Sequence, residues 1–147
     1  MKILKANLKD FKEISQIYME EFSKPPYNEP WDKKKVLDKV RLFSKYCDIW
    51  KVVKDKKIIG FIIINPNFWY PGKFAFGEDI AIKKEYQGKG IGTKVMKAIF
   101  EIYKKRGFER FVGLGNKEAK SFQLWKKLGI KEDKIDKFIS IDLKWKK

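Results

Sequence analysis

The stretch from Phe74 to Gly107 constrains the fold of this chain most, because a strand, a glycine-rich turn and a helix follow one another there. Residues 74–82 (FAFGEDIAI) have the composition of a strand, and residues 87–92 (QGKGIG) form the turn. The helix that follows carries apolar residues on one face of a period of about 3.6 residues. They are Ile91, Val95, Ile99, Ile102 and Tyr103.

Both ends of this helix carry charge-specific features. The cations at 104–106 complement the negative end of the helix dipole, and Gly107 suits a left-handed cap. At the other end the glycine-rich turn predicts an anion site, because bare N–H groups converge there and missing side chains let a phosphate approach. Lys89 and Lys94 add full positive charges.

The spacing of the glycines argues against two common phosphate loops. A dinucleotide fingerprint requires a third glycine where Thr93 stands, and it belongs in the first strand–turn–helix unit of a fold. A Walker loop requires four residues between its first glycine and Gly-Lys-Ser/Thr, and the chain lacks that spacing. An ordinary strand–helix turn without a ligand remains as an alternative.

Two segments resemble one known family. Residues 78–96 (EDIAIKKEYQGKGIGTKVM) resemble the acetyl-CoA signature of the GNAT superfamily of N-acetyltransferases, Arg/Gln-x-x-Gly-x-Gly/Ala after a hydrophobic strand. Residues 116–130 (NKEAKSFQLWKKLGI) resemble its second motif, in which an asparagine and a small residue precede an aromatic residue and a Leu-Gly-Phe stop. Ile130 replaces that Phe. Two registers are open: one uses Asn116, and the other uses Ser121 with Glu118 in the asparagine position.

The resemblance implies an α/β chain of the α+β type with the GNAT fold. That fold is a mixed, mostly antiparallel sheet of about six to seven strands with a splayed parallel pair, flanked by about four helices. Residues 1–147 are expected to form one such domain. Asn7 with Asp10, and Asp32, are predicted helix caps. Strands are expected at 3–4, 49–54, 58–64, 74–82, 109–114 and 138–145, and helices at 8–22, 32–43, 91–105 and 116–128.

The resemblance also assigns residues to the binding of acetyl-CoA (coenzyme A), the expected cofactor. The turn and the helix N-terminus would hold the pyrophosphate, and the backbone of residues 80–82 would pair with pantetheine like an added strand. Trp125 falls where many members have a tyrosine acid. Since an indole N–H cannot release its proton near neutral pH, we predict a packing role for it. The full set is Ile80, Ala81, Ile82, Gln87, Gly88, Lys89, Gly90, Ile91, Gly92, Thr93, Asn116, Ser121 and Trp125.

Glu78 and Asp79 are the only carboxylates of the central strand and are the predicted catalytic residues. Desolvation in an apolar strand raises the pKa of a carboxyl group, which suits a base acting directly or through water. Glu78 matches the position of the family's frequent glutamate base, and Asp79 is the second choice. In the alternative, one of the two is a structural ion-pair partner of a nearby lysine.

Two aromatic loops are predicted to bind the acceptor. The proline-broken segment 24–31 carries Tyr27 and Trp31, and it resembles a segment that borders the acceptor site in GNAT enzymes. The loop at 65–72 carries Trp69 and Tyr70. The alternative for each pair is structural: the first would hold its loop against the core, and the second would pack on the sheet edge.

The composition of the chain indicates which classes of partner and which cellular compartment to expect. The net charge of +16 suggests an acidic partner, but the cations are spread along the chain and only Arg41, Arg106 and Arg110 are arginines, so nucleic acid is not favoured. The absence of histidine excludes Cys/His metal sites and a histidine base, so no metal is expected. A single Cys47, no signal-peptide pattern and no apolar run of membrane-spanning length predict a cytoplasmic protein.

These features together predict an acetyl-CoA-dependent N-acetyltransferase that moves an acetyl group to a primary amine of a small molecule or peptide. The amine would attack directly, with a carboxylate as base. The alternatives are a non-catalytic GNAT-like domain that binds acyl-CoA or regulates a partner, and a basic nucleic-acid-binding protein. No membrane partner is expected and a homodimer is left open, as is the choice among polyamines, protein N-termini, lysines, aminoglycosides and small metabolites.

Overall fold

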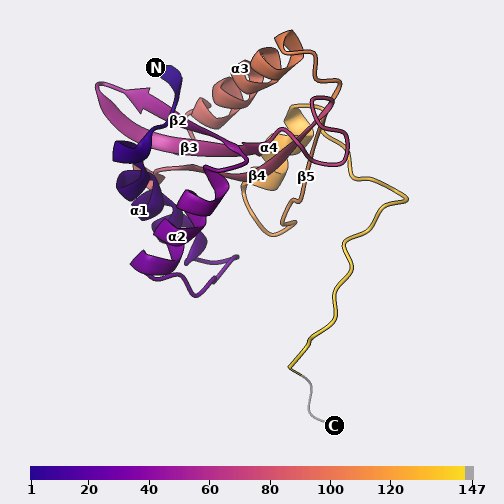
Figure 1. The fold of residues 1–147 in the computed structure, drawn as a ribbon, viewed down its shortest axis with the longest axis horizontal. Helices are drawn as coiled ribbons and strands as arrows, with labels where there is room; N and C mark the ends of the chain where they lie inside the picture. The colour runs from indigo at the N-terminus through magenta and orange to yellow at the C-terminus, as the bar shows by residue number, and fades with distance from the viewer. Residues whose placement is uncertain (145–147) are drawn as a thin grey trace.

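A five-stranded sheet forms the centre of the computed structural model, which describes residues 1–144. The first three junctions between strands are antiparallel, and β4 and β5 run parallel. The described residues therefore form the mixed, mostly antiparallel sheet that the sequence predicts (Figure 1). The strands lie in chain order: β1 (Lys2–Lys5), β2 (Asp48–Lys54), β3 (Lys57–Asn65), β4 (Phe74–Ile82) and β5 (Arg110–Gly113).

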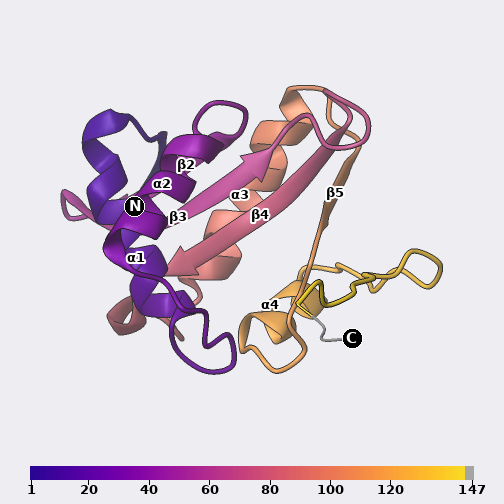
Figure 2. The ribbon, with the colours of Figure 1, turned by 60° about the horizontal axis from the view of Figure 1, so that its bottom comes forward.

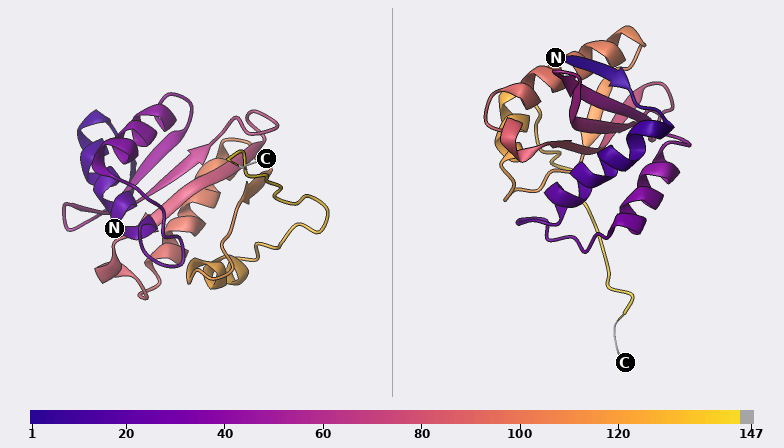
Figure 3. Two further views of the ribbon diagram at one scale, coloured as in Figure 1. Left: turned by 90° about the horizontal axis from the view of Figure 1, so that it is seen from below. Right: turned by 90° about the vertical axis from the view of Figure 1, so that its left-hand side faces the viewer.

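Helices cover both faces of the sheet. α1 (Phe11–Phe22) and α2 (Lys33–Phe43) lie on one face and α3 (Ile91–Lys105) on the other, and α4 (Ser121–Lys127) follows β5 (Figures 1 and 3). Two short 3₁₀ turns, η1 (Leu8–Asp10) and η2 (Lys84–Tyr86), precede α1 and α3. The predicted caps are confirmed: Asn7 and Asp10 form a capping box, and Asp32 accepts a hydrogen bond from the Lys35 N–H at 2.8 Å. Among residues 1–144, no helix combines the length and apolarity needed to cross a membrane.

Two apolar cores, one on each face of the sheet, hold these layers together. Phe61 and Ile63 of β3 belong to the core under α1 and α2, whereas Ile62 and Ile64 belong to the core under α3. Because β3 is buried on both faces, its sequence is a continuous apolar run and not an alternating one. The predicted apolar face of α3 is buried at Ile91, Val95, Ile99 and Tyr103.

β4 contains a bulge at Glu78. Gly77 and Asp79 pair with consecutive residues of β3, so Glu78 has no partner in the ladder. Such an extra residue shifts the alternation of side chains between the two faces of a strand. Ala75 accordingly belongs to the α3 core, whereas Ala81, an even number of residues later, belongs to the α1/α2 core. The bulge therefore puts Asp79 on the face that α1 and α2 cover.

The sheet has five strands within the described residues, and the prediction of about six to seven was too high. The predicted strand at 138–145 is absent over 138–144, and Trp145 lies outside the described residues. Alternation of polar and apolar residues suits a strand, but the hydrogen bonds of a strand come from a neighbour. This segment pairs with none here. Phe138, Ile139, Ile141 and Leu143 are 75–86% exposed.

The elements around β5 are shorter than predicted. β5 spans 110–113 and not 109–114. α4 begins at Ser121 and not at Asn116, because the Asn116 side-chain oxygen accepts a hydrogen bond from the Glu118 N–H at 2.9 Å and closes a turn. The second motif therefore consists of a turn followed by a short helix.

Candidate active site

The parallel strands β4 and β5 pair over four residues and then diverge. Their last pair joins Gly77 and Gly113, and Figure 2 shows the two strands separating toward their C-terminal ends. A Cβ on Gly77 would lie 2.5 Å from the ring of Phe111, so the packing of this ring against β4 favours glycine at position 77. Beyond this pair, and within residues 1–144, residues 78–82 have no strand beside them on the β5 side.

The glycine-rich turn links the end of β4 to α3. Gly88 and Gly90 have φ angles of +74° and +77°, in the left-handed region that favours glycine. Gly90 is the N-cap of α3 and, as a glycine, has no side chain that could cap the helix. A Cβ at either glycine would meet no atom within 4 Å, so the space beside both glycines is open. The turn therefore fits a phosphate, which requires free N–H groups and close access.

Gln87 ties this turn to two other elements. Its side-chain nitrogen donates to the Ile82 carbonyl at 2.7 Å and to the Glu21 carboxylate of α1 at 2.8 Å. Its amide is thus engaged within the protein and supports the turn. Lys89 lies on the exposed side, with its Nζ 5.9 Å from the centroid of the Tyr86 ring.

The carboxyl group of Glu78 is half-buried at the bulge. Burial raises its pKa above the ordinary value, and the charge of Lys39 and the Asn65 side chain oppose this shift. Burial, followed by the charge of Glu78, also raises the pKa of the Cys47 thiol to about 12. Because two residues of a bulged strand lie opposite one residue of its neighbour, Glu78 and Asp79 both lie at Ile63, which belongs to the α1/α2 core.

Asp79 forms an ion pair with Lys39 of α2. The Lys39 Nζ lies 3.2 Å from Oδ2 of Asp79, whose side chain is 15% exposed. Burial raises the pKa of Asp79 to about 6, although Lys39 and the Tyr18 hydroxyl lower it. Of the two predicted catalytic residues, Asp79 is therefore the one with a lysine partner.

The loop at 24–31 packs against α1. The Tyr27 ring lies 4.9 Å from that of Phe22, and the Trp31 ring meets Tyr18 edge-on at 5.3 Å. Both rings thus hold the loop against the core, as the structural alternative predicts. Trp31 also lies beside the ion pair, with Lys39 Nζ 5.0 Å from its ring centroid.

Trp69 and Tyr70 lie at the other end of β4. Their rings pack on Phe74, the first residue of that strand, at 6.3 and 5.2 Å. Together with Arg110 they line an open depression. The structure brings them to the start of β4, whereas Glu78 and the glycine-rich turn lie further along the strand and past its end.

The second motif packs beside the glycine-rich turn. A Cβ on Gly92 would lie 3.3 Å from the Leu124 side chain, so α4 contacts the first turn of α3. Trp125 is partly buried against the α3 core, and a Cβ on Gly115 would lie 3.7 Å from its ring. Ser121 is the first residue of α4. The two family motifs therefore meet at one end of α3.

Sequence reasoning missed Lys39 and Tyr18 as site residues. Lys39 stands three residues after Val36 and four before Phe43, which places a cation within the apolar stripe of α2. A cation inside an apolar stripe was the sequence signal that could have identified Lys39. Tyr18 is fully buried in the apolar stripe of α1, and nothing in its spacing distinguishes it from an ordinary core residue.

The family of the chain follows from comparison with known proteins. The family model described as "Acetyltransferase (GNAT) family" matches residues 11–130. The chain therefore belongs to the GNAT acetyltransferase family.

One curated relative and two solved structures illustrate the similarity. Thialysine N-epsilon-acetyltransferase from Sus scrofa is 33% identical over 64 residues, and the match covers 43% of this chain but only 38% of that protein. A possible acetyltransferase from Clostridium difficile 630 has a TM-score of 0.81 at 17% identity and covers 97% of both chains. The aminoglycoside N-acetyltransferase AAC(6')-Iy in complex with CoA has a TM-score of 0.75 at 14% identity, over 95% of this chain and 93% of that one. At these identities the solved structures show a shared fold.

Proposed function

We propose that the protein is an N-acetyltransferase that transfers the acetyl group of acetyl-CoA to a primary amine. The junction of β4 and α3 carries this proposal. A strand edge left unpaired beyond Gly77 leads into a turn where Gly88 and Gly90 leave a helix N-terminus accessible. An extended group that ends in phosphates can pair along such an edge and place its anion on the helix.

In this proposal two parts of the chain hold acetyl-CoA, which supplies an activated acetyl thioester when bound. The turn at 87–92 and Thr93 receive the pyrophosphate, and the backbone of 80–82 pairs with the pantetheine arm. Asn116, Ser121 and Trp125 are the residues proposed to contact the cofactor from the second motif. The related aminoglycoside acetyltransferase whose structure includes CoA supports the choice of cofactor.

Glu78 is the proposed base. An aliphatic amine is protonated near neutral pH, so a base must accept its proton before it can attack. Asp79 already pairs with Lys39, whereas Glu78 forms no salt bridge among the described residues. The raised pKa of Glu78 increases its ability to hold that proton. The backbone N–H groups beside the bulge are the proposed donors to the developing oxyanion.

A turnover screen tests the proposal. Acetyl-CoA is mixed with a panel of primary amines, and released coenzyme A thiol is measured. The protein's own Cys47 thiol is buried with a pKa raised to about 12, so a sample without acetyl-CoA should give a small background. Turnover with at least one amine is expected. A melting shift with acetyl-CoA but no turnover would favour the non-catalytic acyl-CoA-binding alternative. The absence of both the melting shift and turnover would overturn the proposal.

A further inference from the structure

The ammonium group of Lys39 sits in an aromatic cage. Its Nζ lies 4.7, 5.0 and 5.2 Å from the ring centroids of Tyr18, Trp31 and Phe43. The same nitrogen pairs with Asp79 and donates a hydrogen bond to the Tyr18 hydroxyl. An ion pair by itself needs only the carboxylate. Three rings and an anion around one nitrogen form the surroundings that proteins use to bind alkylammonium ligands.

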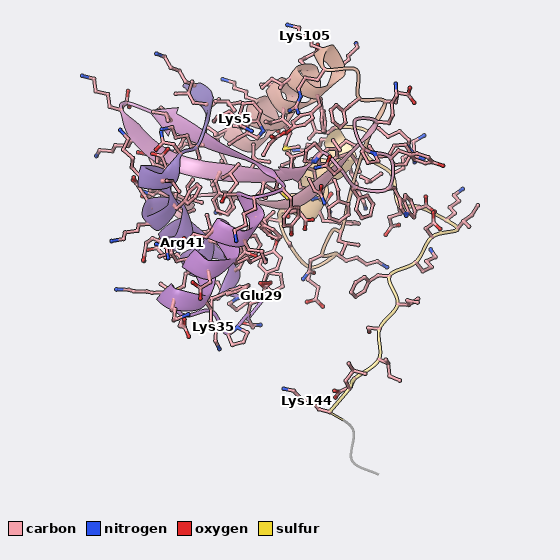
Figure 4. All side chains as sticks on the ribbon, viewed as in Figure 1. Lys5, Glu29, Lys35, Arg41, Lys105 and Lys144 are labelled. Atoms are coloured by element: carbon pink, nitrogen blue, oxygen red, sulfur yellow. The ribbon has the colours of Figure 1, made fainter. Side chains whose placement is uncertain are left out.

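Carboxylates gather around this cage in a chain whose net charge is +16. The Glu29 carboxylate accepts a hydrogen bond from the Trp31 indole N–H at 2.8 Å. The pKa of the Tyr18 hydroxyl is raised, first by burial and then by the charges of Asp79, Glu29 and Glu78. Figure 4 shows Glu29 below the sheet, in the layer of α1 and α2. Three negative charges around one lysine make this a locally anionic site on a cationic protein.

We propose that this cage is a binding subsite for an ammonium group of the acceptor, and that Lys39 fills it in the free protein. The subsite is defined by Tyr18, Trp31, Phe43 and Asp79. Lys39 is a tethered occupant that can leave, because its side chain is a flexible alkyl chain and is 25% exposed.

The chemistry of the cage also indicates the class of acceptor, a step that rests on the proposed acetyl transfer. Rings and a carboxylate hold the charged ammonium form, which has no lone pair with which to attack. The caged nitrogen is therefore not the one that reacts. The acceptor carries at least two amino groups, one held at Asp79 and another presented to Glu78, the neighbouring residue on β4. This is the chemistry of an alkyl diamine or a larger polyamine.

Binding without acetyl-CoA tests the subsite independently of any turnover. Calorimetric titration with 1,4-diaminobutane and with tetramethylammonium is carried out on the natural protein and on Lys39→Ala, which vacates the cage. We expect Lys39→Ala to bind both cations about tenfold more tightly. Lys35→Ala is the matched control: it removes the same charge from the same helix at a side chain that is 67% exposed, and should leave binding unchanged. Equal affinity in all three proteins would overturn the proposal.

A second variant tests the rings separately from the carboxylate. Trp31→Leu, added to Lys39→Ala, removes one wall of the vacated cage and keeps Asp79, so the double variant should bind both cations less tightly than Lys39→Ala does. Melting curves establish that each variant is folded. If Trp31→Leu leaves tetramethylammonium binding intact in that background, the rings do not form the subsite and the proposal fails.

Turnover then tests the acceptor class. With acetyl-CoA present, 1,4-diaminobutane should have a higher kcat/KM than butylamine, and Lys39→Ala should lower KM for the diamine only. Equal effects on both amines would refute the two-nitrogen acceptor while leaving acetyl transfer intact. Cation binding without any turnover would preserve the subsite and overturn only the proposed enzymatic function.

Discussion

Lys39 approaches Asp79 to 3.2 Å, and this contact distinguishes the two neighbouring carboxylates of β4. Asp79 has a cation beside it, whereas Glu78 has no salt bridge among residues 1–144. A pair of acids that is symmetric in the sequence is therefore asymmetric in its electrostatics. The predictions below begin from that difference.

Glu78→Gln should lower kcat by roughly 10²–10⁴-fold and leave acetyl-CoA affinity nearly unchanged, because a base acts on the amine and not on the cofactor. Steady-state kinetics and a melting shift with acetyl-CoA measure the two quantities. Asp79→Asn is the paired variant. A large loss of kcat in Asp79→Asn with none in Glu78→Gln would show that the other carboxylate is the base.

The same residue should control the pH dependence of kcat/KM. Burial raises the pKa of Glu78, so its basic form is lost as pH falls through a value above that of an ordinary carboxyl group. We expect the midpoint of the acidic limb of this profile to lie above the usual carboxyl pKa range. The residual activity of Glu78→Gln should lack this limb. An acidic limb that persists unchanged in the variant would assign it to a different group.

Asp79 should make stability depend on pH between about 4 and 6. Its pKa is raised from 3.8 to about 6, so the folded state binds more protons than the unfolded state in this window. Stability then falls as pH rises, by about 3 kcal/mol across the window. Chemical denaturation at several pH values should show this decline in the natural protein and not in Asp79→Asn. Parallel curves for the two proteins would contradict it.

Gly90→Glu should abolish the rise in melting temperature caused by acetyl-CoA. In the natural protein, acetyl-CoA at 100 times its dissociation constant should raise the free energy of unfolding by about 2.7 kcal/mol. The substitution places bulk and negative charge where a phosphate would bind. Gly107→Glu at the other end of α3 is the matched control, because Gly107 also has a positive φ, +90°, and open space around its Cβ position. Both variants carry the same kind of backbone strain. Equal loss of the shift in both would remove the turn from the binding site.

Trp125→Phe should retain most activity, whereas Trp125→Ala should lose about 2 kcal/mol of stability through the cavity it leaves. The basis is that Trp125 is partly buried against the α3 core and cannot serve as a proton donor at neutral pH. Thermal melting and turnover measure the two effects. Loss of turnover in Trp125→Phe, with normal melting and cofactor binding, would show that the indole N–H acts directly.

The sequence predicted the elements whose signals are local. Glycines at the turn, caps at Asn7 and Asp32, and the stripe on α3 depend on a few neighbouring residues, and the structure contains each of them. The segment after residue 137 shows the limit of such signals. Alternating residues indicate what a strand requires, but the neighbour that would complete it is a matter of tertiary structure.

The site was predictable in its backbone and much less so in its side chains. The open turn and the position of β4 follow from glycine spacing and apolar runs. The pairing of Lys39 with Asp79 joins residues far apart in the sequence, and it depends on how α2 crosses the sheet. Gln87 similarly turned out to support the turn, because its partners on β4 and α1 cannot be read from the motif.

The bulge at Glu78 lets this strand lose one residue without losing its register. Gly77 pairs with Ile64 and Asp79 with Ile63, so removal of Glu78 would leave both pairs in place and would keep Asp79 on the face that α1 and α2 cover. In a regular strand, by contrast, the loss of one residue exchanges the two faces from that point on. A single-codon deletion at Glu78 would therefore remove the proposed base together with the bulge, and the carboxylate left on the strand would be the one that pairs with Lys39.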